Sequence, residues 1–173
     1  MRGVLLLATQ LGACGSDNVV GPKGVKDLAG TWAVTRWELI NTLDAMQRVS
    51  VLPAGDGALL EISPVGSFTF TIASLSLGVI VVQRGTLTIH GDTLTYTVTT
   101  TTVTPAFGAA AGTGTLAVRG DQSTYDAEAN EVLFVVELTG AVMSWRALEP
   151  TLIDINDDGV PDQTVEELAF ARS

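Results

Sequence analysis

The sequence predicts an all-β fold with one domain, a single antiparallel up-and-down β-barrel, and a β-sandwich is the alternative. Three observations favour this class. Threonine and valine are abundant along the whole chain, and these branched residues favour strands over helices. Apolar and polar residues alternate with a period of two in many short segments. Turn residues separate these segments at hairpin spacing, which is typical of a barrel or a sandwich.

Composition and charge narrow the class of protein further. The chain has 173 residues, of which 46% are hydrophobic and 16% charged, so it can bury one full core and is not of the disordered type. The formal net charge of −10 disfavours nucleic acid as a partner. The single cysteine, Cys14, and the single histidine, His90, exclude an intramolecular disulfide and a Cys/His zinc cluster.

The N-terminus predicts an export signal. One positive charge precedes a short apolar run in Met1–Ala8, and this run is too short to span a bilayer. It leads to Leu11-Gly12-Ala13-Cys14, which resembles the lipobox of bacterial lipoproteins. The resemblance implies a signal peptide at residues 1–13, a lipid on Cys14 that attaches the protein to a membrane, and a place in the bacterial cell envelope. Gly15 after the cysteine implies the outer membrane. The alternative is an ordinary N-terminus in which Cys14 is a free thiol.

Residues 14–26 are rich in glycine and polar residues and contain a proline, which predicts a flexible tether between the lipid and the domain. The domain itself is expected at residues 27–173.

The strands of the domain follow from the alternation. In Ser67–Ser74, for example, the apolar residues occupy every second position, and His90-Gly91-Asp92 predicts a tight turn between two such segments. Val132–Leu138 is apolar at both parities, so we expect both of its faces to be covered. Strands are expected at residues 31–40, 57–63, 67–74, 78–90, 93–104, 112–118, 131–139, 142–149 and 164–172.

The start of the first strand carries a family resemblance. Asp27-Leu28-Ala29-Gly30-Thr31-Trp32 resembles the opening of the lipocalins and of small bacterial lipoproteins with a lipocalin-like domain. The resemblance extends over Asp27–Ser173. It implies that Gly30 and Trp32 open the first strand, that Trp32 closes the base of the barrel, and that Arg172 near the C-terminus packs over the ring as a cation–π pair. It also implies a small or apolar ligand in the mouth of the barrel.

A loop near the C-terminus predicts a calcium site. Residues 154–162 place acidic and amide side chains at loop positions 1, 3, 5 and 9 and a glycine at position 6, a spacing that suits the hard oxygen ligands of Ca²⁺. The candidate ligands are the side chains of Asp154, Asn156, Asp158 and Asp162 and the carbonyl of Val160. Position 12 is not the bidentate glutamate of an EF-hand, so the expected Kd is roughly 10⁻⁴–10⁻³ M. The alternative is a hairpin turn that needs no metal.

No constellation of residues predicts catalysis, and we expect a protein that is not an enzyme. Ser123 and Ser144 lie in no Gly-x-Ser-x-Gly elbow. Glu166 and Glu167 are adjacent, so on a strand they face opposite sides and cannot form a pair of catalytic carboxylates.

The sequence leaves two functions open. One is a ligand-binding barrel. The other is a structural or protein-interaction module of the envelope without a pocket. A luminal cavity of several hundred Å³ would favour the first. An interior filled by the large aromatic residues would favour the second; these residues are Phe68, Phe70, Tyr96, Phe134 and Trp145.

Overall fold

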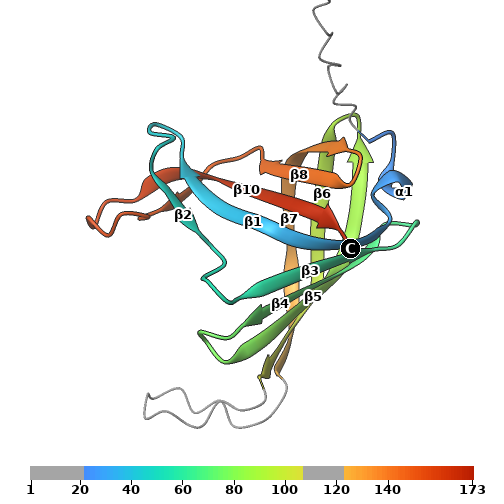
Figure 1. Cartoon of the computed structure of the whole chain (residues 1–173), viewed down its shortest axis with the longest axis horizontal. Coiled ribbons are helices and arrows are strands. Elements are labelled where there is room, and N and C mark those ends of the chain that lie inside the picture. Colours follow the sequence, from blue (N-terminus) through green and yellow to red (C-terminus); the bar gives the residue numbers. More distant parts are fainter. Residues whose placement is uncertain (1–21, 107–122) are drawn as a thin grey trace, which may run out of the picture.

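The computed structural model describes residues 22–106 and 123–173, and the side chains in these ranges apart from those of residues 123–130. This part of the chain forms one short helix and ten strands (Figure 1). In chain order they are α1 (Val25–Leu28), β1 (Gly30–Asn41), β2 (Arg48–Ser50), β3 (Gly57–Ile62), β4 (Ser67–Ser74), β5 (Val79–His90), β6 (Thr93–Pro105), β7 (Ser123–Thr139), β8 (Val142–Ala147), β9 (Thr151–Ile153) and β10 (Asp162–Arg172). Within the two described ranges, no helix is long and apolar enough to cross a bilayer.

Eight of the strands close into a barrel. β1, β3, β4, β5, β6, β7, β8 and β10 pair in this order, each antiparallel to the next. β10 then pairs with β1 from Trp32↔Arg172 to Asn41↔Thr164, which closes the sheet. The structure therefore confirms the predicted up-and-down barrel of lipocalin-like type and decides against the sandwich. Closure removes the free sheet edges that an open sheet of this size would expose.

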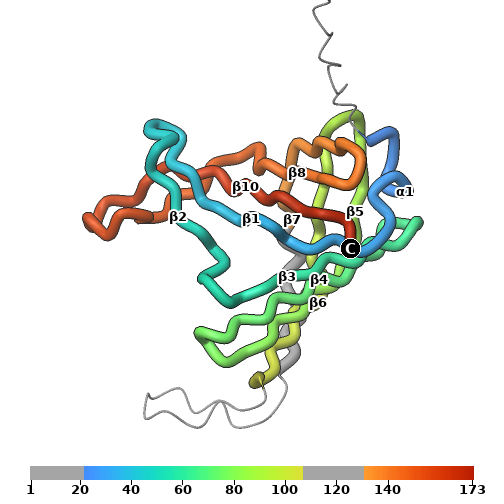
Figure 2. The backbone as a smooth tube through the Cα atoms, in the orientation of Figure 1, coloured from blue at the N-terminus to red at the C-terminus, as the bar shows by residue number. Residues whose placement is uncertain are grey.

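The two remaining strands lengthen one side of the barrel. β2 pairs with the second half of β1, and β9 pairs with the first residues of β10. The result is a four-stranded ribbon, β2-β1-β10-β9, which projects to the left in Figures 1 and 2. β2 and β9 have three residues each, all of them exposed, so no alternation of apolar and polar residues predicts them.

The two ends of the barrel differ. The short connections β3–β4, β5–β6 and β7–β8 lie at the end where α1 and the last residues of β10 meet (Figure 2). Leu28 of α1 is fully buried at this end, which we call the closed end. The connections after β1, β4 and β8 reach the opposite end, which we call the mouth.

The interior follows the alternation predicted from the sequence. Along β3 and the first six residues of β6 every second side chain is buried, and along β8 Met143, Trp145 and Ala147 point inward. Aromatic rings of nearby strands contact one another in the interior: the ring centroids of Phe68 (β4) and Tyr96 (β6) lie 4.4 Å apart, and those of Trp145 and Phe170, on the paired strands β8 and β10, lie 4.9 Å apart. The hydrophobic core therefore fills the closed half of the barrel.

Two expectations differ from the structure, and a third cannot be compared with it. Pro22 is buried and Val25–Leu28 is helical, so the folded part begins before the expected end of the tether at Lys26. Apolar side chains on α1 pack against the core, which explains this difference. The outer face of Val132–Leu138 is not fully covered, because Leu133 is 37% exposed. The strand expected at residues 112–118 lies outside the described residues.

Candidate functional site

Gly30, Trp32 and Arg172 come together at the closed end. The Trp32 side chain is 0% exposed, and its indole N–H donates a hydrogen bond to the carbonyl of Leu28 at 2.7 Å. The guanidinium carbon of Arg172 lies 4.8 Å from the centroid of the Trp32 ring, and Arg172 also donates to the carbonyl of Ala29. These contacts join the first strand, the last strand and α1. They close one end of the lumen, so a ligand has to enter from the mouth.

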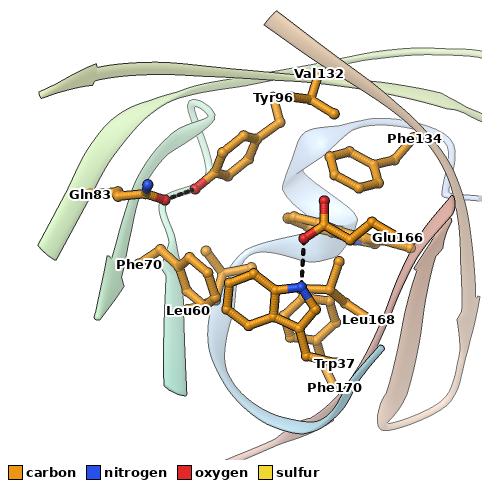
Figure 3. Close-up of a pocket in the computed structure, with 11 residues that line it drawn as sticks. Trp37, Leu60, Phe70, Gln83, Tyr96, Val132, Phe134, Glu166, Leu168 and Phe170 are labelled. Atoms are coloured by element: carbon orange, nitrogen blue, oxygen red, sulfur yellow. Dashed lines mark hydrogen bonds between the residues drawn. The ribbon is translucent and has the colours of Figure 1, made fainter. Parts of the chain in front are cut away.

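Above this base the lumen holds a cavity of about 150 Å³. Eleven residues line it, and every one of the eight barrel strands contributes at least one of them (Figure 3). Most are apolar or aromatic. They are Trp37, Leu60, Phe70, Gln83, Tyr96, Val132, Phe134, Trp145, Glu166, Leu168 and Phe170.

Two hydrogen bonds order the polar side chains of the pocket. The indole N–H of Trp37 donates to Oε1 of Glu166 at 2.5 Å. The Tyr96 hydroxyl donates to Oε1 of Gln83 at 3.0 Å. In Figure 3 the Glu166 carboxylate lies between Trp37 and Phe134 and points into the pocket. Glu166 is two inward positions nearer the mouth than Phe170, because β10 runs towards the closed end and side chains alternate along a strand.

Burial shapes the electrostatics of this pocket. It raises the pKa of the Glu166 carboxyl above its ordinary value, although the hydrogen bond from Trp37 acts in the opposite direction. Burial also raises the pKa of Tyr96, and the negative charge of Glu166 raises it further. The residues that line the cavity include no Lys, Arg or His. The Trp145 indole N–H is buried and has no acceptor among the described residues.

The sequence correctly placed Glu166 and Glu167 on opposite faces, but it did not identify Glu166 as a pocket residue. Glu167 points outward, where its carboxylate lies 3.8 Å from Arg36 and 3.4 Å from Arg146. Glu166 shares the inward face with Leu168 and Phe170. The sequence did carry a signal that could have identified Glu166 as a pocket residue: it is a charged residue at a position that the alternation assigns to the interior.

The loop at residues 154–162 uses its acidic side chains to bind its own backbone. Asp154 accepts hydrogen bonds from the N–H groups of Asp158 and Gly159 at 3.3 and 2.8 Å, and Asp158 accepts one from Val160 at 2.8 Å. Asn156 accepts from the N–H of Asp158 at 3.0 Å. Of the two remaining candidate ligands, Asp162 accepts a hydrogen bond from the side-chain amide of Asn41, and Val160, whose carbonyl is the other candidate, is exposed. Among the described residues, no group of three or more His, Cys, Asp or Glu side chains is arranged to hold a metal ion.

Calcium binding at this loop stays a prediction. If the loop binds Ca²⁺ with a Kd near 10⁻³ M, about 10 mM calcium should stabilise the fold by roughly 1.4 kcal/mol. The double variant Asp154→Asn, Asp158→Asn should lose this effect, whereas the amide oxygens that it retains can still accept the backbone hydrogen bonds. Thermal melts of the wild type with calcium and with chelator measure the effect, and coincident curves would contradict calcium binding.

Comparison of the chain with family models, curated proteins and solved structures finds no match. The geometry of the chain itself therefore has to carry the functional argument. The fold and the pocket define a class: a closed eight-stranded antiparallel barrel with a small cavity in its lumen. The signal peptide expected at residues 1–13 and the lipidation expected at Cys14 lie outside the described residues.

Proposed function

We propose that this protein is a lipid-anchored lipoprotein of the bacterial envelope whose barrel binds one small, largely apolar ligand in its lumen. The observation that carries the binding function is the cavity of about 150 Å³ to which all eight barrel strands contribute. Apolar protein cavities of roughly 150 Å³ hold a molecule of the size of benzene. The cavity is smaller than the several hundred Å³ of a site for a drug-sized ligand, so the proposed ligand is about the size of one aromatic ring.

One polar group of the pocket wall supports a binding site over a filled core. The Glu166 carboxylate accepts a single hydrogen bond, from Trp37, among the described residues. Buried polar groups in a core without a ligand are usually satisfied by the protein itself. Groups that are left incompletely satisfied at a cavity are available to orient a ligand.

The expected affinity is modest. Burying roughly 200 Å² of apolar ligand surface at about 25 cal/mol per Å² contributes about 5 kcal/mol. This free energy corresponds to a Kd of about 0.2 mM. The costs of association make this the favourable limit for a neutral ligand, so we expect sub-millimolar to millimolar Kd values.

Filling the cavity is expected to abolish binding. Val132 lines the pocket, and the next residue, Leu133, lies on the outer face of the same strand. Val132→Trp should weaken binding of the neutral probe benzyl alcohol at least about tenfold, because its ring occupies the ligand space, and Leu133→Trp should leave binding unchanged. Chemical-shift titration of the folded variants gives the Kd values.

The binding proposal fails if the wild type binds neither benzyl alcohol nor any other probe of the size of one ring. It also fails if both tryptophan variants bind benzyl alcohol as the wild type does, because the ligand would then lie outside the lumen.

The proposed anchoring rests on Leu11-Gly12-Ala13-Cys14 and the apolar run before it. Cys14→Ser is expected to release a folded protein from the membrane fraction, because the serine hydroxyl cannot take the place of the lipidated thiol. Fractionation with mass spectrometry of the mature N-terminus measures this. Retention of the variant in the membrane, or an unmodified Cys14 in the wild type, would contradict it.

A second candidate function is a protein-interaction module. Two observations favour it: the interior buries the five large aromatic residues Phe68, Phe70, Tyr96, Phe134 and Trp145, and a ribbon projects from the barrel. Leu43 and Met46, in the connection between β1 and β2, are 86% and 89% exposed, and Leu152 of β9 is also exposed. Large apolar side chains exposed on a projecting part of a protein are candidates for contact with a partner. If the wild type does not bind small apolar probes, the protein-interaction function is favoured over the ligand-binding function.

A further inference from the structure

Among the described residues, the Glu166 carboxylate has no counter-ion, and most of the side chains that line the pocket around it are apolar or aromatic. Its Oε1 accepts one hydrogen bond, from Trp37, and no hydrogen bond or ion pair to its Oε2 is found among the described residues. A carboxylate can accept about four hydrogen bonds through its two oxygens. Most of the acceptor capacity of Glu166 is therefore free for a ligand.

The neighbouring residue, Glu167, differs from Glu166 because positively charged side chains lie close to its carboxylate. Glu167 faces outward, and Arg36 and Arg146 both lie within 4 Å of it. Glu166 faces inward, where the lining of the cavity includes no Lys, Arg or His. Burying a carboxylate without a positive partner is unfavourable, so a positively charged ligand would supply the interaction that the protein does not.

The aromatic side chains around Glu166 favour the same ligand charge. Trp37 and Phe134 lie on either side of the carboxylate, and Tyr96 lies across the pocket from it (Figure 3). The negative faces of aromatic rings attract cations, and this attraction grows when the cation is removed from water. A carboxylate together with aromatic rings therefore suits an organic cation better than a neutral or an anionic molecule.

We propose that the luminal ligand is a small monocyclic amine, bound through an ion pair between its ammonium group and Glu166, with its ring packed on the aromatic wall. This inference rests on the proposed function, because it specifies the chemical class of ligand for the same cavity. Benzylamine is the simplest probe of this class: one ring matches the cavity of about 150 Å³, and one methylene carries the ammonium group.

Binding should depend on pH through Glu166. Only the ionised carboxylate pairs with the ammonium group, and burial raises the pKa of Glu166 in the empty pocket. Lowering the pH through this raised pKa should therefore weaken benzylamine binding, because the acid becomes neutral. Tyr96 is the other titratable group that lines the cavity, and its raised pKa keeps it neutral over this range. An alkylammonium with a pKa of about 10, like that of Lys, stays charged throughout.

The test uses three ligands of similar size and different charge: benzylamine, benzyl alcohol and benzoate. For the wild type near neutral pH we expect benzylamine to bind about tenfold more tightly than benzyl alcohol, and benzoate to bind most weakly. Glu166→Gln should weaken benzylamine binding about tenfold and remove its pH dependence, and it should affect the neutral benzyl alcohol much less. The glutamine oxygen can still accept the Trp37 hydrogen bond, so the wall of the pocket is kept. Glu167→Gln is the matched control and should change neither ligand.

Each outcome bears on one of the two proposals. If benzyl alcohol binds in the lumen as tightly as benzylamine, the charge inference is overturned and the proposed function stands. If benzylamine binds equally to the wild type and to Glu166→Gln, it binds through other acidic groups of this negatively charged protein and not through Glu166. The inference is then again overturned. If none of the ligands binds the wild type, the proposed function fails together with it.

Discussion

Trp32→Ala is expected to lower the free energy of unfolding by about 3–5 kcal/mol, the range for removing a fully buried large aromatic side chain. The change deletes a ring that is 0% exposed, its hydrogen bond to the Leu28 carbonyl and the surface on which Arg172 packs. These contacts hold the closed end of the barrel, where β1, β10 and α1 meet. Equilibrium unfolding in denaturant measures the loss.

Two further variants separate the contributions. Trp32→Phe keeps an aromatic ring and loses the indole N–H, so it should cost less than the alanine variant. Leu43→Ala, at an exposed position, should stay within about 0.5 kcal/mol of the wild type. A Trp32→Ala protein within about 1 kcal/mol of the wild type would show that Trp32 and Arg172 do not hold the closed end.

Gly85→Ala is expected to destabilise the barrel by about 3 kcal/mol or more, at the upper end of the range for overpacking a core. A Cβ atom at this position would lie 1.9 Å from the backbone oxygen of Thr97 and 2.8 Å from Cε1 of Phe68. The register of β5 against β6 shifts between Arg84 and Gly85, so the two strands approach closely at this bulge. A backbone oxygen cannot move away without disturbing the pairing of β5 and β6. The shift of the unfolding midpoint measures the effect.

Gly57→Ala is the matched control. Gly57 is also a strand glycine, in β3, and a Cβ atom there would meet nothing within 4 Å. This substitution should leave stability unchanged or raise it slightly, since alanine restricts the unfolded chain more than glycine does. Equal stabilities for the Gly57 and Gly85 variants would contradict the close approach of β5 and β6.

The sequence predicts the strands of the barrel well where burial is one-sided. Alternation is a local property of residues two positions apart, and it locates β3, β4, β6 and β8 to within one or two residues. Closure of the barrel depends on residues far apart in the chain. Only the resemblance that connects Trp32 with Arg172 indicated that β1 and β10 would meet.

The elements that were missed carry little local signal. β2 and β9 are short and exposed, and they form because the long strands β1 and β10 extend past the barrel and offer free backbone groups. The outward positions of Val132–Leu138 include the partly exposed Leu133 and the charged Glu137, and periodicity alone could not distinguish this strand from one that is buried on both sides.

The candidate pocket was less predictable than the fold. Alternation placed Glu166 opposite Glu167, but the contents of the lumen depend on which side chains from eight strands meet at one level. The register of each pair of strands decides this, and register is a tertiary property. The pairing of Trp37 with Glu166 joins residues 129 positions apart, so no local pattern could have revealed it.

The most direct test of ligand binding in the lumen is a crystal structure of the protein soaked with benzylamine at about ten times its Kd. We expect density for one molecule inside the barrel, with its nitrogen within hydrogen-bonding distance of Glu166 and its ring among Trp37, Tyr96 and Phe134. A lumen without ligand density in a barrel of unchanged structure would contradict it, whether or not benzylamine is found on the outer surface.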